Sequence, residues 1–227
     1  MNGDTTPALL VTGGGGTTNV LAISGTSAAW DIHGTVGPTP SFVSLDTNRS
    51  FVYSNLSSIV ANVSGNGSNF LIVNPEANVT LNLGATSGNK INQLDNGNSK
   101  QIGVVIDQSG TSYSSADWTI SGTDVTVNLD GGGVVSLLHI GVVTNKLTTL
   151  SAKGAAAGDD TFHVTAEATG GVKFTVDGGA GGSDTLDVIH SSGALSNTGS
   201  PNGTAWITGG YEDILYFGIE LFEDNGV

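Results

Sequence analysis

The stretch TDVTVNL, residues 123–129, alternates valine and leucine with polar residues and leads into Asp130 and three glycines. A period of two places the apolar side chains on one face of a β-strand. The same alternation recurs in NVTLNL (78–83) and VKFTV (172–176), and glycine follows each within two residues. Strand, glycine turn and strand therefore succeed one another along the chain, which predicts an all-β fold.

Residues 41–64 are the one segment that also fits a helix. Leu56, Ile59, Val60 and Val63 have the spacing of an apolar helical stripe. The same residues also fit a strand that ends at the glycines that follow. Because the rest of the chain is patterned as strands, we favour the strand and keep a short helix as the alternative.

The composition excludes two classes of partner. The chain has 227 residues, with 20 acidic against 6 basic residues and a formal net charge of −14. Such an acidic surface repels nucleic-acid phosphates and anionic lipid headgroups. The apolar runs are far shorter than the ~20 residues that cross a bilayer, so neither nucleic-acid binding nor membrane insertion is expected. The absence of cysteine fits a bacterial or archaeal extracellular protein that does without disulfides.

The three tryptophans of the chain are evenly spaced. Trp30, Trp118 and Trp206 lie 88 residues apart, and glycine stands four residues after each, in WDIHG, WTISG and WITGG. The segments FLIVNPEAN (70–78) and FHVTAEAT (162–169) share an opening phenylalanine and support the same division. Self-similarity at a fixed period is typical of tandem-repeat proteins. We therefore predict a partial repeat at 1–29, full units at 30–117 and 118–205, and a partial repeat at 206–227.

Two architectures fit a repeat of this length. A string of small β-sandwiches suits a long period with one tryptophan in each unit. A parallel β-solenoid suits the low aromatic content, the threonine and asparagine ladders and the glycine turns. We prefer the parallel β-solenoid.

Two glycine–aspartate segments point to a family. AGDDTFHV (157–164) and GGAGGSDTLDV (178–188) resemble the G-G-x-G-x-D-x-L-x turns of RTX-type secreted bacterial proteins. More loosely, the chain resembles the β-rich tandem repeats of very large bacterial surface proteins, including a late GIE element, here at 218–220. The resemblance implies a parallel β-roll with calcium bound between successive coils.

The resemblance also names candidate ligands. It implies calcium at Asp159, Asp160, Asp177 and Asp184, because aspartate carboxylates are hard oxygen ligands and glycine permits the tight turn. The alternative is that these residues are ordinary turn formers. The corresponding positions of the preceding unit read GSNF and GATSGN, without carboxylates, so any calcium would be local.

The predicted units leave incomplete repeats at both ends. Either the chain is a piece of a longer array, or the ends of separate molecules complete each other head to tail. The apolar segment ILYFGIELF (214–222) supports the second reading if it needs a partner surface. The alternative is that this segment packs as a buried strand within its own chain.

No residue stands out as catalytic. The four histidines, at 33, 139, 163 and 190, are far apart in sequence and lack the spacing of metal ligands, which favours positions on strand faces. With 20 acidic residues, no carboxylate pair is selected for glycan hydrolysis. We therefore expect a non-enzyme.

The expected function is a non-enzymatic extracellular building block: a self-assembling filament, a surface layer or an adhesin stalk. Its expected partners are copies of itself and surface glycans. One alternative is a glycan- or surface-binding module that uses Trp30, Trp118 and Trp206 as stacking platforms, although one tryptophan in each unit also fits a core position. A second alternative is a β-helical polysaccharide-processing enzyme.

Overall fold

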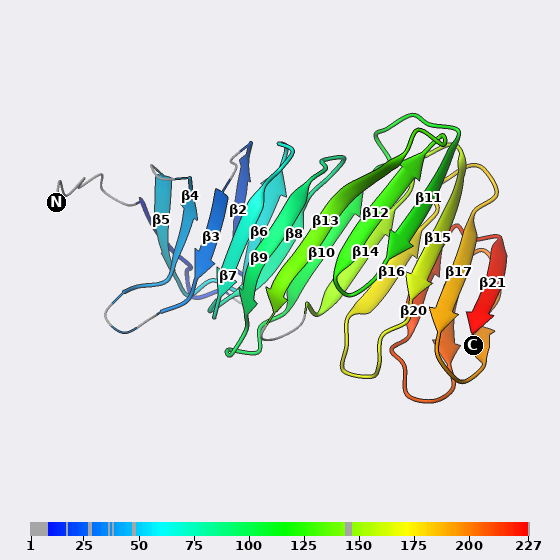
Figure 1. The fold of residues 1–227 in the computed structure, drawn as a ribbon. Coiled ribbons are helices and arrows are strands. Elements are labelled where there is room, and N and C mark those ends of the chain that lie inside the picture. Colours follow the sequence, from blue (N-terminus) through cyan, green and yellow to red (C-terminus); the bar gives the residue numbers. More distant parts are fainter. Residues whose placement is uncertain are drawn as a thin grey trace.

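The computed structural model of the protein describes residues 9–226 except 17, 27, 28, 36, 38, 47, 48 and 144–146. Within these residues every regular element is a β-strand and there is no helix (Figure 1). The all-β class predicted from the alternation of apolar residues is therefore confirmed. No described segment is a helix that is long and apolar enough to span a membrane.

The strands follow one another along the long axis of the molecule and form two sheets that face each other (Figure 1). Sheet A has twelve strands, which in chain order are β1 (Leu9–Thr12), β3 (Ala29–His33), β4 (Phe42–Leu45), β5 (Arg49–Ser54), β7 (Asn69–Val73), β9 (Asn89–Asp95), β11 (Ser115–Ile120), β12 (Asp124–Leu129), β13 (Val134–Val143), β15 (Asp159–Thr165), β17 (Thr185–His190) and β21 (Leu221–Gly226). Sheet B has nine strands, which are β2 (Val20–Gly25), β6 (Ser58–Val63), β8 (Asn78–Asn82), β10 (Ile102–Asp107), β14 (Thr149–Lys153), β16 (Lys173–Asp177), β18 (Leu195–Asn197), β19 (Gly203–Ile207) and β20 (Ile214–Phe217).

The chain winds between the two sheets as a solenoid. It runs from β6 in sheet B to β7 in sheet A, back to β8 and on to β9, and strands of successive coils pair in parallel. Many contacts between adjacent coils join residues 20 to 24 positions apart, such as the bond from Asn82 Nδ2 to Asn62 Oδ1 at 2.8 Å and that from the Asp160 N–H to Asp184 Oδ1. The preferred architecture, a parallel β-solenoid, is therefore the observed one.

Antiparallel hairpins interrupt this winding in sheet A. The pair β4–β5 follows β3, and the pair β12–β13 follows β11. The two insertions have the same topology, because the strand order β1-β5-β4-β3-β7 recurs as β9-β13-β12-β11-β15. A third hairpin, β18–β19, instead extends the edge of sheet B.

Two of the three tryptophans occupy equivalent places in the fold, and the third does not. Trp30 of β3 stacks on Phe70 with ring centroids 6.1 Å apart, and Trp118 of β11 stacks on Phe162 at 5.4 Å. Both indoles are fully buried, so they are equivalent core residues of their coils. Trp206 instead lies in β19 of sheet B, and 37% of it is exposed. The repeat length of 88 residues therefore stays a prediction.

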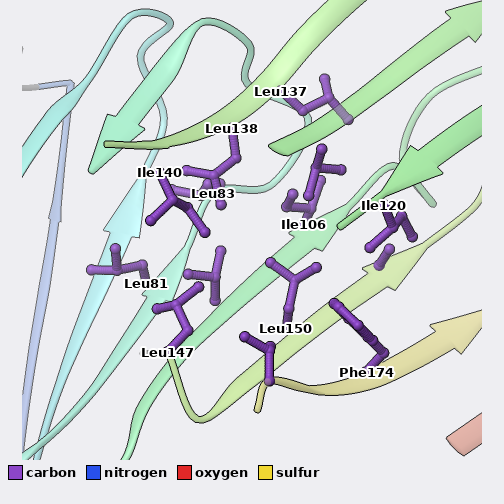
Figure 2. Packing of buried hydrophobic residues seen from close by; sticks show 14 of the residues in the cluster. Leu81, Leu83, Ile106, Ile120, Leu137, Leu138, Ile140, Leu147, Leu150 and Phe174 are labelled. Carbon is purple, nitrogen blue, oxygen red and sulfur yellow. The ribbon is translucent and has the colours of Figure 1, made fainter. Parts of the chain in front are cut away.

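The core consists of columns of apolar side chains between the sheets. Leu81, Val104, Leu150 and Phe174 are register partners in the four neighbouring strands β8, β10, β14 and β16, and all are buried. Figure 2 shows Leu81, Leu150 and Phe174 in this packing. Burying each such side chain contributes about 1.5–3 kcal/mol. Because coils stack directly on one another, each column joins several coils into one core.

The two segments with alternative sequence interpretations are both strands. Phe42–Leu45, Arg49–Ser54 and Ser58–Val63 form β4, β5 and β6, so the strand interpretation is confirmed and the helix is wrong. In β20, Ile214 and Tyr216 are buried, whereas Leu215 and Phe217 face outward and are 47% and 44% exposed. The apolar segment at 214–222 therefore buries one face in its own chain and leaves the other face open.

Candidate functional site

A column of carboxylates lies where the chain turns from sheet B into sheet A. Asp160 is the second residue of β15, and Asp184 and Glu220 directly precede β17 and β21. The three residues occupy matching positions in three successive coils. The N–H of Asp160 donates to Asp184 Oδ1 at 2.8 Å, and the N–H of Asp184 donates to Glu220 Oε2 at 2.9 Å. The carboxylates of Asp184 and Glu220 therefore each accept the backbone N–H of the column residue one coil before. We call these three residues the carboxylate column.

Glycines make room for this column. A Cβ atom at Gly154 would lie 2.3 Å from Asp160 Oδ2, and one at Gly178 would lie 2.3 Å from Asp184 Oδ2. Real Cβ contacts are never this short, so the turn from β14 to β15 and that from β16 to β17 each require glycine at this place. The glycine–aspartate pattern of the sequence thus has a packing cause.

Asp160 is tied to the aromatic core. Its Oδ1 accepts hydrogen bonds from the Tyr113 hydroxyl and from Trp118 Nε1, each at 3.0 Å. Its Oδ2 is buried and has no hydrogen-bond partner among the described residues. Burial raises the pKa of Asp160, while the two hydrogen bonds oppose that rise. The equivalent tryptophan of β3 has no such carboxylate, because Ser68 stands at the corresponding place before Phe70.

Asp184 has the most perturbed pKa of the column. Burial raises its pKa to about 7, repulsion from Asp160, Glu220 and Asp159 adds to the rise, and the hydrogen bond from the Asp160 N–H opposes it. The side chain is almost completely buried, with 2% of the residue exposed. A carboxyl group in this setting changes its charge near neutral pH.

The other two predicted ligands, Asp159 and Asp177, lie on the outer side of the same turns from sheet B into sheet A. We call this part of the molecule the acidic corner. Asp159 Oδ1 accepts the Ser183 N–H at 2.8 Å, which again joins neighbouring coils. Asp177 Oδ1 accepts the Gly179 N–H at 3.0 Å, and its Oδ2 lies 3.3 Å from Lys153 Nζ. Both carboxylates therefore have structural partners in the turn.

The four aspartates come close in space but do not form a metal centre as placed. Among the described residues there is no group of three or more His, Cys, Asp or Glu side chains arranged to hold a metal ion. The arrangement gives the expected calcium site at Asp159, Asp160, Asp177 and Asp184 no support of its own, and that site stays a prediction. The structure instead supports the turn-forming role that was its alternative.

A hollow of about 370 Å³ lies beside the carboxylate column. Asp177, Asp184, Glu220 and Phe217 line it, together with the glycine-rich turn at 179–182. Glu220 was not among the sequence-based candidates, although it belongs to the GIE element at 218–220. Its position in the column depends on the stacking of β21 against β17, which sequence spacing alone does not show.

The histidines lie on strands, as expected, but three of them pair with aspartates of adjacent strands. His190 is buried, and its two ring nitrogens lie 2.8 Å from the Ser192 carbonyl oxygen and 2.7 Å from Asp224 Oδ1. The pairing lowers the pKa of Asp224. The other two pairs, each with a nitrogen–oxygen distance of 2.6 Å, are His139–Asp124 and His163–Asp187.

Burial separates the two roles, core residue and stacking platform, that the sequence left open for the three tryptophans. Trp30 and Trp118 are fully buried, so neither indole has a face for a sugar ring. Trp206 alone of the three is exposed, on the outer face of sheet B.

The chain was compared with protein-family models, curated proteins and solved structures. No family model, no curated protein and no solved structure matches this chain.

Proposed function

We propose that the chain is a non-enzymatic structural building block of extracellular material, such as a filament, a surface layer or an adhesin stalk. The observation that supports this proposal best is the continuous stacking of coils along one axis, with both sheets running the length of the described chain (Figure 1). Parallel stacking with apolar columns inside and polar ladders outside makes a stiff, elongated body.

The edges of the two sheets support assembly between copies. In sheet A the edge strands are β1 and β21, and the pairing pattern makes them run in the same direction. In sheet B the edge strands β2 and β18 also run in the same direction. A second copy added along the axis would therefore continue both sheets in parallel, which is a head-to-tail contact that does not close on itself.

Exposed apolar side chains lie on these edge strands. Leu9 and Leu10 of β1 are 60% and 65% exposed, and Leu221 of β21 is 53% exposed. Burying them between copies would add a hydrophobic contribution to the backbone hydrogen bonds of the new strand pair.

Light scattering on edge variants tests the proposal. We expect the wild-type protein to gain mass as its concentration rises, and we expect Leu10→Lys and Leu221→Lys to stay smaller because a lysine on an edge strand opposes pairing. Val134→Lys is the matched control, since Val134 is 73% exposed but β13 is an interior strand of sheet A. A wild-type protein that stays monomeric, or edge variants that assemble like the control, would contradict the proposal.

Glycan binding is the second candidate function, and exposed Trp206 favours it. Trp206 and Leu215 both face outward from the β19–β20 hairpin, where an indole face can stack on a sugar ring. If this face binds polysaccharide, Trp206→Ala should abolish retention in affinity electrophoresis while the circular dichroism spectrum stays unchanged. Equal retention of the variant and the wild type would remove this candidate.

A further inference from the structure

A buried histidine beside the edge strand β21 faces two hydrogen-bond acceptors. His190 is the last residue of β17, and only 2% of its side chain is exposed. Its Nδ1 lies 2.8 Å from the Ser192 carbonyl oxygen, and its Nε2 lies 2.7 Å from Asp224 Oδ1. Neither neighbour can donate, because a carbonyl oxygen and an ionised carboxylate only accept hydrogen bonds.

This arrangement requires a proton on each ring nitrogen. A neutral imidazole carries one N–H, so it can donate to only one of the two oxygens and turns a lone pair toward the other. The protonated ring donates to both. The pKa of Asp224 is lowered, chiefly by the hydrogen bond from His190, so its carboxylate is ionised over the range in which histidine gains its proton. The contacts of His190 therefore fit the imidazolium form.

The ring joins β21 to the rest of the last coil. Asp224 belongs to β21, whereas Ser192 belongs to the segment that leads from β17 into β18. The β21 backbone also rests on the ring, because a Cβ atom at Gly226 would collide with His190. Among the described strands, β21 pairs with β17 alone. Contacts through this ring therefore add to the one strand pairing that holds β21.

The other titratable groups of the surrounding elements have partners or positions elsewhere. Tyr211 meets the His190 ring edge-on, with centroids 6.2 Å apart, and its hydroxyl lies 2.9 Å from the Ser191 hydroxyl. The acidic residues at the end of β15 and before β20 point to other groups or to solvent: Glu167 lies against Gly122, Glu212 accepts the Gly170 N–H, and Asp213 is exposed. Asp224 is therefore the one acidic side chain among the described residues that contacts the ring.

Groups on the outer face of sheet A also reach β21. Side chains alternate along a strand, so Asp187 and Glu223 lie on the face opposite to the buried histidine. Asp187 pairs with His163 of β15 at 2.6 Å and accepts Asn225 Nδ2 at 2.7 Å. His163 is thus a second histidine through which pH can act on β21. Asp184 of the acidic corner lies at the opposite end of the strand.

We propose that His190 is a pH-dependent clamp on the edge strand β21. In its protonated form the ring holds Asp224 and the Ser192 carbonyl oxygen together. When the proton leaves, one of the two contacts is lost and the end of β21 loosens from β17. The clamp is therefore complete at mildly acidic pH and is lost as pH rises through the range in which histidine titrates.

The clamp also regulates assembly between copies. An ordered edge strand is the template with which a second copy would pair. This consequence rests on the function proposed above, whereas the effect on β21 itself does not. Assembly should therefore weaken as rising pH releases the clamp.

Nitrogen-15 NMR of the histidine rings tests the charge. We expect both ring nitrogens of His190 to carry a proton at about pH 5.5. His33 is the internal reference, because burial lowers its pKa and its ring therefore supplies the spectrum of a neutral imidazole near pH 7. A His190 ring that is already neutral at about pH 5.5 would overturn the proposal.

Hydrogen exchange of dilute protein, measured by mass spectrometry and corrected for the intrinsic effect of pH on exchange, tests the clamp. Protection of β21 should fall about tenfold between about pH 5.5 and about pH 8, because a hydrogen bond to a charged group is lost. Protection of β14, an interior strand of sheet B, is the reference. Protection of β21 that stays constant relative to β14 would contradict the clamp.

Variants identify the group that is responsible. Asp224→Asn should remove the dependence of β21 protection on pH, because an amide can accept from the charged ring or donate to the neutral one. The Asp224 side chain is 49% exposed, so the variant should fold. His163→Gln and His139→Gln are the matched controls, since each removes another histidine–aspartate pair of sheet A, and both should keep the dependence. A dependence that persists in Asp224→Asn, or disappears in His163→Gln, would show that another group carries it.

Light scattering on the same proteins separates the clamp from assembly. We expect assembly to weaken with rising pH more in wild type than in Asp224→Asn. Equal weakening in both would overturn the control of assembly by the clamp. A wild-type protein that is monomeric at every pH but shows the expected exchange would contradict the structural function, and the clamp on β21 would stand.

Discussion

Gly178 shows at the scale of a single residue how a missing methyl group shapes the acidic corner. A Cβ atom added at Gly178 would lie 2.3 Å from Asp184 Oδ2 and 2.5 Å from the Gly218 carbonyl oxygen. Gly178→Ala should therefore destabilise the protein by about 1–3 kcal/mol in guanidinium unfolding, because the turn must shift. Gly110→Ala is the control, since its added Cβ would meet no atom within 4 Å. Equal stability of the two variants would show that the corner relaxes freely.

Two tryptophans of the same sequence motif should respond differently to substitution. Trp118→Phe removes the indole N–H that donates to the buried Asp160 carboxylate, and it also leaves space in the core. We expect a loss of roughly 1–3 kcal/mol in the free energy of unfolding. Trp206→Phe should cost less than about 0.5 kcal/mol, because this indole faces solvent. The reverse order in chemical denaturation would contradict the assignment of Trp118 to the core.

The buried carboxyl of Asp184 predicts a dependence of stability on pH. Its pKa is about 7 in the folded protein against 3.8 for an ordinary aspartate carboxyl, so between these values the folded state holds a proton that the unfolded chain has released. The free energy of unfolding contributed by this group therefore falls as pH rises from about 4 to 7, and it is constant outside that window. Asp160, whose pKa is also raised, acts in the same direction.

Comparison with Asp184→Asn isolates this effect. The difference in unfolding free energy between wild type and variant, measured by denaturation at several pH values, should change steadily between pH 4 and 7. Asp117→Asn serves as the control for the loss of one charge, and it should keep the wild-type slope. A wild-type slope that survives unchanged in Asp184→Asn would show that this carboxyl is not the titrating group.

At the scale of strands, the sequence predicts which segments are strands but not which sheet each one joins. Alternation identifies β12 at TDVTVNL and β16 at VKFTV, because one face of each strand is buried. Both sheets bury one face against the same core, so a strand of sheet A and one of sheet B have the same local pattern. Trp206 shows the consequence, since its motif matches that of Trp118 but its strand pairs in the other sheet.

The carboxylate column is likewise predictable from the sequence only in part. Glycine–aspartate turns predict that Asp159, Asp160, Asp177 and Asp184 lie in turns, and all four lie at or beside the corner. The sequence could not place Glu220 in the column, because the chain between β17 and β21 contains a hairpin and a strand of sheet B. Successive coils differ in length, so contacting residues of the column are 24 positions apart in one case and 36 in the other. Such contacts depend on how whole strands stack and do not follow a fixed spacing in the sequence.

Position within the sheets predicts a gradient of hydrogen exchange. Amides of β14 and β16 lie between paired strands, whereas among the described strands β1 and β21 each have one pairing partner. We expect exchange measured by mass spectrometry on dilute protein to be fastest in β1 and β21 and slowest in β14 and β16. Equally slow exchange in the edge strands of dilute protein would show that another part of the molecule covers them.

At the scale of the whole molecule, the two sheets form one elongated stack whose edge strands share a direction. Copies that join head to tail, as proposed, would continue both sheets without any change in the hydrogen-bonding pattern. The acidic surface, with a formal net charge of −14, opposes close contact between copies. Added salt screens this repulsion and should therefore promote assembly.

Negative-stain electron microscopy of the concentrated protein tests this account most directly. We predict unbranched filaments as thick as one solenoid, formed by wild type and by Val134→Lys and absent from Leu10→Lys and Leu221→Lys. Grids prepared with and without millimolar calcium chloride would show whether the aspartate turns influence assembly. Single elongated particles of one chain at every concentration and salt level would contradict head-to-tail assembly.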